Sequence, residues 1–373
     1  MKKIYLDNNA TTPLDPAALD AMVEELAASP RNPSSFHSFG REGKKILSEA
    51  RTKIAQILKV KNDEILFTSG GTEGINLLIR GAYQTSNSHI ITTAIDHAAI
   101  YDTIQDLAAK GAEITYLPID SYGSPKPIDL QKALRPNTSL IVLSAANSET
   151  GVKLDIEKIA SIAETAHIPL ILDGVAMLGK EPFTIPEGVL GMAFSAHKFH
   201  GPQGVGFNFI RHGFKLSPLF TGGGQEKKLR SGTENLPGIV GMATALTQNP
   251  NYSYIKSLRD LFESKLFGAI PDLEINGDGP RLPNTSNLYF PGVDGESLLI
   301  ALDMENIAAS HASACSSGAL EPSRTLLNMG YSKERASSSL RFSFSRFNTP
   351  EEIKEASQVI TRLVNKLRYG ALA

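Results

Sequence analysis

The chain has 373 residues, of which 41% are hydrophobic and 20% are charged, and its formal net charge at pH 7 is −2. This length predicts more than one domain, or one large domain with an appendage, and the composition is that of a globular protein. Lysines and arginines form no block and no apolar run is long enough to span a membrane, so we expect neither direct nucleic-acid nor direct membrane binding.

Helical and strand-like segments alternate along the first two thirds of the chain. The first helices are expected at residues 16–28 and 38–58. Short apolar runs, typical of buried strands, follow at residues 64–69, 89–94, 139–145, 168–173, 191–198 and 204–210. Such runs separated by helices predict an α/β fold with a largely parallel sheet covered on both faces. Ligands of such sheets bind at the carboxyl ends of the strands.

After residue 250 the pattern changes to that of a smaller α+β domain. The stretch 339–347 alternates apolar and polar residues, which predicts a half-buried strand. Thr349 and Glu352 predict a capping box at the start of the last helix. Other helices are expected near residues 252–268 and 296–304. We therefore expect a large domain over residues 14–250 and a small domain built from residues 1–13 and 251–373.

A lysine directly follows one of the predicted strands, in "SAHKFHGPQGVG" (195–206). A buried lysine is costly unless its amine has a task, and a neutral amine is a nucleophile that forms Schiff bases. A lone strand-end lysine more often extends to solvent. Here Ser195, His197 and a glycine-rich turn accompany Lys198. Hydroxyl, imidazole and backbone N–H groups suit a phosphate ester.

Other strand ends carry groups that complement this lysine. The turn "TSGGTEG" (68–74) opens a helix, whose N–H groups favour a phosphate, although an ordinary strand-to-helix turn remains an alternative. Asp173 ends another strand, and a buried carboxylate needs a cationic partner or caps the next helix. His97 follows a third strand, where a structural histidine is the usual case. A Schiff-base lysine, a phosphate cradle and a strand-end aspartate together suggest pyridoxal phosphate.

Cys315 is the only cysteine, and small residues flank it in "ASHASACSSGALEPS" (309–323). One cysteine excludes an internal disulfide and a multi-cysteine metal site within this chain, so we expect no metal centre and a cytosolic protein. The N-terminus has no apolar region of a secretory signal. A lone cysteine is often a small buried hydrophobe, but the surrounding serines argue against that here.

Taken together, the sequence resembles the NifS/IscS-like cysteine desulfurases, which are fold-type I pyridoxal-phosphate enzymes of the class V aminotransferase group. The resemblance covers nearly the whole chain and runs through these stretches in order: "YLDNNATTPLDP" (5–16), "NPSSFHSFGREG" (32–43), "FTSGGTEGIN" (67–76), "SAHKFHGPQGVG" (195–206), "GGGQEKKLRSGTEN" (222–235), "SACSSG" (313–318) and "LRFSFSRFNTPEEI" (340–353). It implies a large domain with a mainly parallel seven-stranded sheet and a smaller α+β C-terminal domain.

The resemblance also implies a role for individual residues. Lys198 is expected to carry pyridoxal phosphate and to move the substrate Cα proton, and Cys315 to accept sulfur from L-cysteine as a persulfide, leaving L-alanine. His97 is expected to stack on the cofactor ring and to act as a catalytic residue in proton transfer. Arg341 is expected to bind the substrate carboxylate, with help from Asn32. The expected cofactor-binding residues are Lys198, Asp173, His97, Gly71, Thr72, Ser195, His197, Ser148 and, from the other subunit of a homodimer, Thr233.

Two positions depart from the family pattern. Ser148 stands where the family usually has asparagine, and Ala176 stands where it usually has a glutamine that donates to the cofactor's phenolic oxygen. His311 replaces a more usual small residue, and we expect it to be a solvated loop histidine. The predicted function is sulfur delivery, for iron–sulfur clusters, thio-cofactors or tRNA, to an acceptor such as a cluster scaffold or sulfur carrier. The alternatives are a selenocysteine or cysteine-sulfinate lyase, or a weakly active cofactor-binding partner protein.

Overall fold

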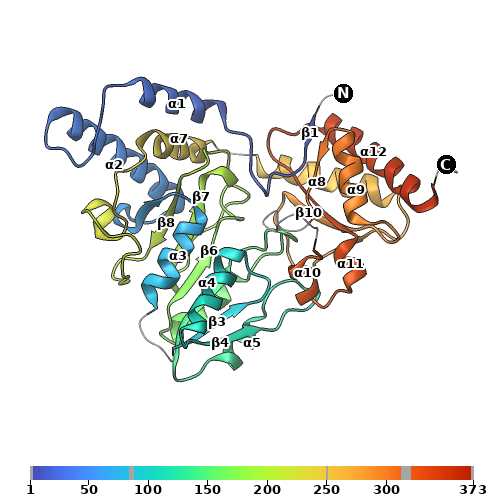
Figure 1. Ribbon diagram of the computed structural model, residues 1–373, viewed down its shortest axis with the longest axis horizontal. Coiled ribbons are helices and arrows are strands. Elements are labelled where there is room, and N and C mark those ends of the chain that lie inside the picture. The colour runs from blue at the N-terminus through green and yellow to red at the C-terminus, as the bar shows by residue number, and fades with distance from the viewer. Residues whose placement is uncertain (1–2, 84–87, 249–250, 312–320, 371–373) are drawn as a thin grey trace.

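The computed structural model describes residues 3–83, 88–248, 251–311 and 321–370 (Figure 1). Its main feature is a seven-stranded sheet with the strand order β2-β8-β7-β6-β5-β3-β4. Neighbouring strands from β7 to β4 pair in parallel, whereas β8 pairs antiparallel with both β7 and β2. The strands are β2 (Ile65–Thr68), β3 (His89–Thr93), β4 (Glu113–Leu117), β5 (Thr138–Ser144), β6 (Leu170–Asp173), β7 (Val189–Ser195) and β8 (Gly206–Ile210). The predicted mainly parallel seven-stranded sheet is confirmed.

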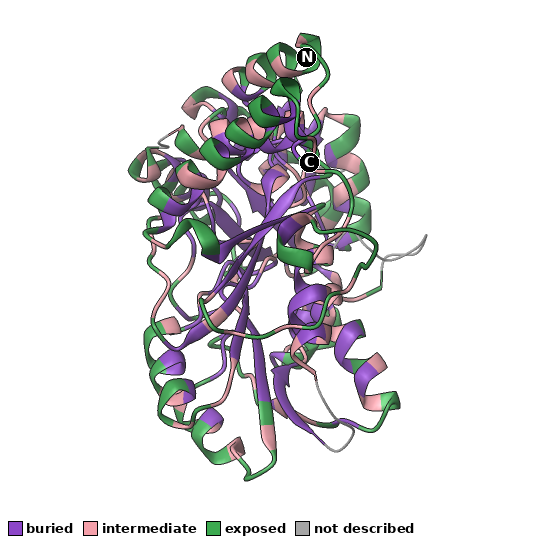
Figure 2. Cartoon of the chain, turned by 90° about the vertical axis from the view of Figure 1, so that its left-hand side faces the viewer, coloured by how far each residue is buried: buried purple, intermediate pink, exposed green. Residues whose placement is uncertain are grey.

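Both faces of this sheet are buried under helices. Side chains of successive strand residues point to opposite faces, and neighbours such as Ile171 and Leu172 accordingly belong to different hydrophobic cores. Figure 1 shows α1, α2 and α7 on one side and α3 and α4 on the other, and the central strands between them are largely buried, whereas the edge strand β4 is mostly half-exposed (Figure 2). The helices are α1 (Pro16–Ala27), α2 (Ser38–Leu58), α3 (Gly71–Ala82), α4 (Ala98–Ala109), α5 (Pro127–Ala133), α6 (Ile156–Thr165) and α7 (Leu236–Thr247).

The C-terminal third of the chain has a hydrophobic core of its own, the C-terminal core. Ile4 and Leu6 from the N-terminal segment also belong to it. Its strands are β1 (Ile4–Tyr5), which pairs in parallel with β11 (Ile307–Ala308), and the antiparallel set β9 (Glu274–Ile275), β10 (Thr285–Tyr289) and β12 (Ser339–Ser343). Its helices are α8 (Tyr252–Phe267), α9 (Gly295–Met304), α10 (Arg324–Asn328), α11 (Lys333–Ser337) and α12 (Pro350–Tyr369). The limits proposed above for the two domains remain a prediction.

The predicted start of the last helix is confirmed, but the prediction for the strand before it is partly wrong. The Thr349 hydroxyl accepts the Glu352 N–H, and the Glu352 carboxylate accepts the Thr349 N–H, each at 3.2 Å. Strand β12 is buried on both faces rather than half-buried. The N-terminal segment covers its polar face: the Ser343 N–H donates to the Leu6 carbonyl and the Ser343 hydroxyl accepts the Asn9 N–H. A covered polar face can carry polar side chains because each finds a partner.

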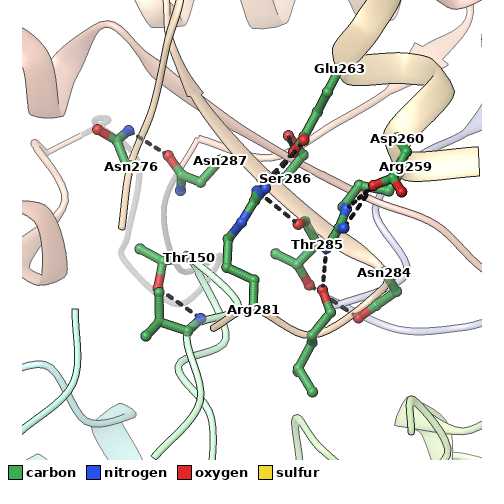
Figure 3. A network of polar contacts seen from close by, with 12 residues as sticks. Thr150, Arg259, Asp260, Glu263, Asn276, Arg281, Asn284, Thr285, Ser286 and Asn287 are labelled. Carbon is green, nitrogen blue, oxygen red and sulfur yellow. Dashed lines mark hydrogen bonds and ion pairs between the residues drawn. The ribbon is translucent and has the colours of Figure 1, made fainter. Parts of the chain in front are cut away.

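A buried polar network fixes β10 against α8 (Figure 3). The Glu263 carboxylate accepts hydrogen bonds from Arg281 at 2.7 Å and from the Ser286 hydroxyl at 2.8 Å. Strand β10 in turn supports the turn after β5: a Cβ on Gly151, whose φ is +75°, would lie 2.7 Å from the Thr285 Cβ. Only glycine therefore allows this turn to lie so close to β10. The network thus positions a turn that reaches the candidate active site.

Candidate active site

A cavity of about 650 Å³ lies at the carboxyl ends of the sheet strands, between the sheet and the C-terminal core. Turns at the strand ends form its wall together with Arg324, Thr325, Arg341 and residues 8–11, as expected for a ligand site at this end of a parallel sheet. Of the residues singled out from the sequence, the wall contains Gly71, Thr72, His97, Ser148, Asp173, Ala176, Ser195, His197, Lys198 and Arg341. Segments up to 333 positions apart in the chain, those of Asn8 and Arg341, therefore meet at one place.

Lys198 lies in the 3₁₀ turn Ala196–Lys198 that directly follows β7. Its ammonium donates to the backbone carbonyls of Asn9 at 2.7 Å and Ala10 at 2.8 Å. The N-terminal segment therefore holds the amine at the cavity wall rather than letting it extend to solvent. This placement matches what an amine needs in order to react with a bound carbonyl compound.

Asp173 is the last residue of β6 and is buried. One of its carboxylate oxygens accepts the Val175 N–H at 2.9 Å. Burial raises the pKa of Asp173, while the electrostatic influence of His97 and Lys198 and the hydrogen bond from Val175 act in the opposite direction. A cationic partner in the cavity would stabilise this buried carboxylate.

His97 is the N-cap residue of α4, and its ring lines the cavity. The Nδ1 atom accepts the Ala99 N–H at 3.1 Å, so the neutral ring carries its proton on Nε2. The preceding residue, Asp96, is buried and accepts hydrogen bonds from Thr93 and from the Ser144 N–H. Asp96 thus fixes the ends of β3 and β5 and, with them, the backbone of His97.

The start of α3 forms a cradle suited to a phosphate. Its N-cap residue is Gly70, which supplies no side chain to cap the helix. A Cβ on Gly71 would lie 2.5 Å from a methyl carbon of Val175, so the close approach of the two turns needs glycine. Ser195 and His197 border the same cavity. Burial, with the charges of two lysines, lowers the pKa of His197 to about 4, so its ring is neutral at pH 7.

Arg341 reaches the cavity from the opposite side, on β12. It is 3% exposed, and its guanidinium donates to the Asp7 carboxylate at 2.7 Å and to the Ser148 carbonyl at 3.1 Å. Its Nε atom is buried and has no hydrogen-bond partner within the described part of the chain. A guanidinium in this position can bind a carboxylate ligand by exchanging its contact with Asp7.

The structure does not bring every predicted site residue together. Asn32 and Thr233 are exposed and do not line the cavity of this chain. Asn32 instead accepts the Ser34 N–H in its own loop at 3.0 Å. Cys315 lies outside the described residues. The roles proposed for these three residues therefore remain predictions.

The prediction for His311 is wrong. His311 is 5% exposed, and its Nε2 donates to the Ser337 carbonyl at 2.8 Å. The ring packs against the start of α9, where a Cβ on Gly295 would lie 2.8 Å from it. The glycine leaves the space that the imidazole fills, so His311 is a buried packing residue rather than a solvated one.

The cavity residues that were not predicted from the sequence include the charged side chains of Glu149, Lys180 and Arg324. Glu149 is buried and accepts hydrogen bonds from the hydroxyls of Ser323 at 2.5 Å and Thr325 at 2.8 Å. Arg324 stacks on the Tyr101 ring with its guanidinium carbon 3.8 Å from the ring centre. Of these three residues, only Lys180 could have been noticed in the sequence, because it closely follows Asp173 in "DGVAMLGK".

Comparisons with known proteins place the chain in a family. Residues 4–355 match the family described as "Aminotransferase class-V". The chain belongs to this family. It is 42% identical to "Cysteine desulfurase IscS" of Dictyoglomus turgidum, over 98% of this chain and 96% of that protein. The cysteine desulfurase branch predicted from the sequence is therefore confirmed as the branch of the class V aminotransferases to which the chain belongs.

Solved structures agree with this family. A "NifS-like protein" has a TM-score of 0.89 and 34% identity, with 98% of this chain and 100% of that chain covered. The structure titled "SspA in complex with cysteine" has a TM-score of 0.85 and 29% identity, with 93% of this chain and 100% of that chain covered. The fold-type I architecture of class V aminotransferases is thereby confirmed.

The class V aminotransferases and cysteine desulfurases depend on pyridoxal phosphate, and the residues of this cavity fit that group. The Lys198 amine, the buried Asp173 carboxylate and the glycine cradle at α3 match its aldehyde, its pyridine nitrogen and its phosphate. In the part of the chain that the structure describes, no helix is long and apolar enough to cross a membrane. The same residues contain no cluster of three or more histidine, cysteine, aspartate or glutamate side chains placed to hold a metal ion.

Proposed function

We propose that this class V aminotransferase removes sulfur from L-cysteine and passes it on as a persulfide on Cys315. The observation that carries the proposal is the cavity in which the Lys198 amine, the Asp173 carboxylate and the Arg341 guanidinium meet. The relatives named as cysteine desulfurases and the SspA structure with cysteine support the choice of substrate. A cytoplasmic location, predicted from the sequence, belongs to the same proposal.

Pyridoxal phosphate would be held by the amine of Lys198, the carboxylate of Asp173, the ring of His97 and, at its phosphate, by Gly71, Thr72, Ser195 and His197. When bound, it supplies an electron sink for the bonds at the substrate Cα. In a homodimer, Thr233 of one subunit would contribute to the phosphate site of the other. Ser148 lies in the wall as well, but its backbone carbonyl, rather than its hydroxyl, makes the described contacts.

Residues of the chain bind the substrate, move its Cα proton and accept its sulfur. Arg341 binds and orients the substrate carboxylate. Lys198, once its amine no longer holds the cofactor, moves the Cα proton. The Cys315 thiolate attacks the substrate sulfur. The carbon–sulfur bond of cysteine breaks, a sulfur–sulfur bond forms on Cys315, and a proton takes the place of sulfur on the carbon. The products are alanine and the persulfide, so no external oxidant or reductant is needed. An acceptor, such as a cluster scaffold or a sulfur carrier, would then take up the sulfur.

The test is to add L-cysteine and a reductant to the protein loaded with pyridoxal phosphate, and to measure sulfide and alanine together. Equal amounts of both from the wild type, and loss of sulfide in Cys315→Ala, are expected. Ser310→Ala, which keeps Cys315, serves as the matched control and should retain both products. Equal sulfide from wild type and Cys315→Ala would overturn the persulfide step.

A protein that binds the cofactor and forms neither product would favour the weakly active binding protein. Ser148 and Ala176 are the observations behind that candidate, because Ala176 lines the cavity and has no group that can donate a hydrogen bond. The substitutions Ser148→Asn and Ala176→Gln would then be expected to increase turnover. Turnover of selenocysteine or cysteine sulfinate, with no product from cysteine, would instead favour a lyase.

A further inference from the structure

Lys180 is a second amine in the wall of the same cavity. It lies at the end of the turn that follows β6, and only 3% of it is exposed. Its backbone N–H donates to the Met177 carbonyl at 3.1 Å, so the turn has a defined shape. None of the proposed steps of desulfuration uses this lysine, although burying an amine costs free energy.

The turn places Lys180 directly beside the segment of Lys198. Gly179 has a φ of +77°, and a Cβ on it would lie 2.6 Å from the Cβ of Phe199, the next residue after Lys198. Any larger residue would push the turn away from Phe199. The glycine therefore keeps the two lysine-bearing segments in contact.

The two amines differ in their partners. The Lys198 ammonium donates to two backbone carbonyls, at 2.7 and 2.8 Å. The Lys180 side chain has no hydrogen-bond or ion-pair partner among the residues that the structure describes. An ammonium needs acceptors for its N–H groups, so Lys180 is the amine of the pair that is more readily neutral, and a neutral amine can accept a proton.

The charges around Lys180 also favour the neutral form of its amine. The titratable and charged groups of its surroundings are Lys198, His197, His200 and Arg346, while Asp15 pairs with Arg346 and Asp173 acts on Lys198. Burial and the positive charges of Lys198 and Arg346 lower the pKa of Lys180 to about 7. A change in the charge of Lys198 must therefore change the protonation of Lys180.

We propose that Lys180 is a positioning residue that acts through Lys198, by taking up the proton that Lys198 must lose before its amine can react with a carbonyl group. One N–H bond breaks on Lys198 and one forms on Lys180, so the net charge of the cavity stays the same. The proton returns when Lys198 again becomes an ammonium. The carbonyl reaction itself rests on the proposed function, but the coupling between the two amines does not.

Competitive labelling of the full-length protein with trace acetic anhydride tests this coupling. The modification of Lys180 is quantified by mass spectrometry from pH 6 to 10, in wild type and in Lys198→Met. In wild type the labelling midpoint of Lys180 is expected near pH 7. Removal of the Lys198 charge should raise this midpoint by about one pH unit or more. Lys158→Met removes an exposed lysine paired with Asp155 and should leave the midpoint unchanged.

An equal midpoint in wild type and Lys198→Met would overturn the proposal, as would a wild-type midpoint near the ordinary lysine value of about 10.4. If Lys198→Met does not fold, Lys198→Gln repeats the measurement, since its amide can still donate to the Asn9 and Ala10 carbonyls. The labelling needs neither cofactor nor turnover. Failure of the proposed desulfurase activity and failure of this proton coupling can therefore be told apart.

Discussion

The two sides of the cavity are built in different ways. On the side of the large sheet, Asp173, His97 and Lys198 each lie within four residues of the end of a strand, so the backbone of the sheet places them. On the opposite side, buried polar contacts between distant segments place the side chains: Arg341 pairs with Asp7, and Glu149 accepts a hydrogen bond from the hydroxyl of Ser323. Single side-chain changes should therefore disturb the second side more readily than the first.

The largest effect is expected from Arg341→Ala. The substitution removes the proposed carboxylate-binding group and leaves Asp7 without its cation. Loss of one partner of a buried, charged hydrogen-bonded pair costs about 2–5 kcal/mol, so kcat/KM for L-cysteine should fall by at least about 30-fold. Steady-state kinetics of alanine formation would measure this fall, with a rise in KM as its main part.

Arg341→Lys is the matched control. Lysine keeps the charge but lacks the planar fork of the guanidinium, so it should recover only part of the loss. An unchanged KM in Arg341→Ala would show that this guanidinium does not bind the substrate, and the second side of the cavity would then be structural only.

Glu149→Gln should have the next largest effect, on stability. The carboxylate accepts two buried hydroxyl groups, from Ser323 and Thr325. Hydrogen bonds to a charged group contribute about 1.5–3 kcal/mol, and the glutamine amide offers only one acceptor oxygen. We expect the free energy of unfolding in urea to fall by about 1–3 kcal/mol.

A double-mutant cycle with Ser323→Ala identifies the contact responsible. If the Ser323–Glu149 hydrogen bond carries the effect, the two substitutions together should cost clearly less than their sum. Strictly additive effects would mean that Glu149 stabilises the protein in some other way.

His200 predicts a pH dependence. Burial, with the positive charge of Lys180, lowers its pKa to about 3, well below the ordinary value near 6.5, although the hydrogen bond to the Pro13 carbonyl acts in the opposite direction. The unfolded chain therefore binds the proton first as the pH falls. This contribution to stability is complete above about pH 6.5 and is lost progressively toward pH 3.

His200→Asn should remove that dependence. From pH 8 to pH 5, unfolding in urea should show the wild type losing about 2 kcal/mol more than the variant. His197, whose pKa is also lowered, titrates in both proteins and cancels in the difference. Equal losses in wild type and variant would contradict a neutral, buried His200.

The same contrast explains what the sequence could predict. Residues at strand ends, such as Asp173 and Lys198, were found because a short apolar run ending in a polar residue is visible locally. Strand β4 was missed because its residues are mostly half-exposed at the edge of the sheet and form no apolar run. The partners of Arg341 and Glu149 lie more than 170 positions away, and no local pattern encodes such pairs. The burial of His311 depends on space left by Gly295, which is equally non-local.

The smallest effect is expected from Glu113→Gln, the same chemical change as Glu149→Gln at a site exposed to water. Glu113 lies on the edge strand β4 and pairs with Arg135 at 3.1 Å, and about half of each side chain is exposed. Exposed ion pairs contribute between zero and about 1 kcal/mol, because water and salt screen the charges. We expect the free energy of unfolding in urea to change by less than about 0.5 kcal/mol, and the change to vanish at high salt. A loss equal to that of Glu149→Gln would mean that burial is not what makes the contacts of Glu149 strong.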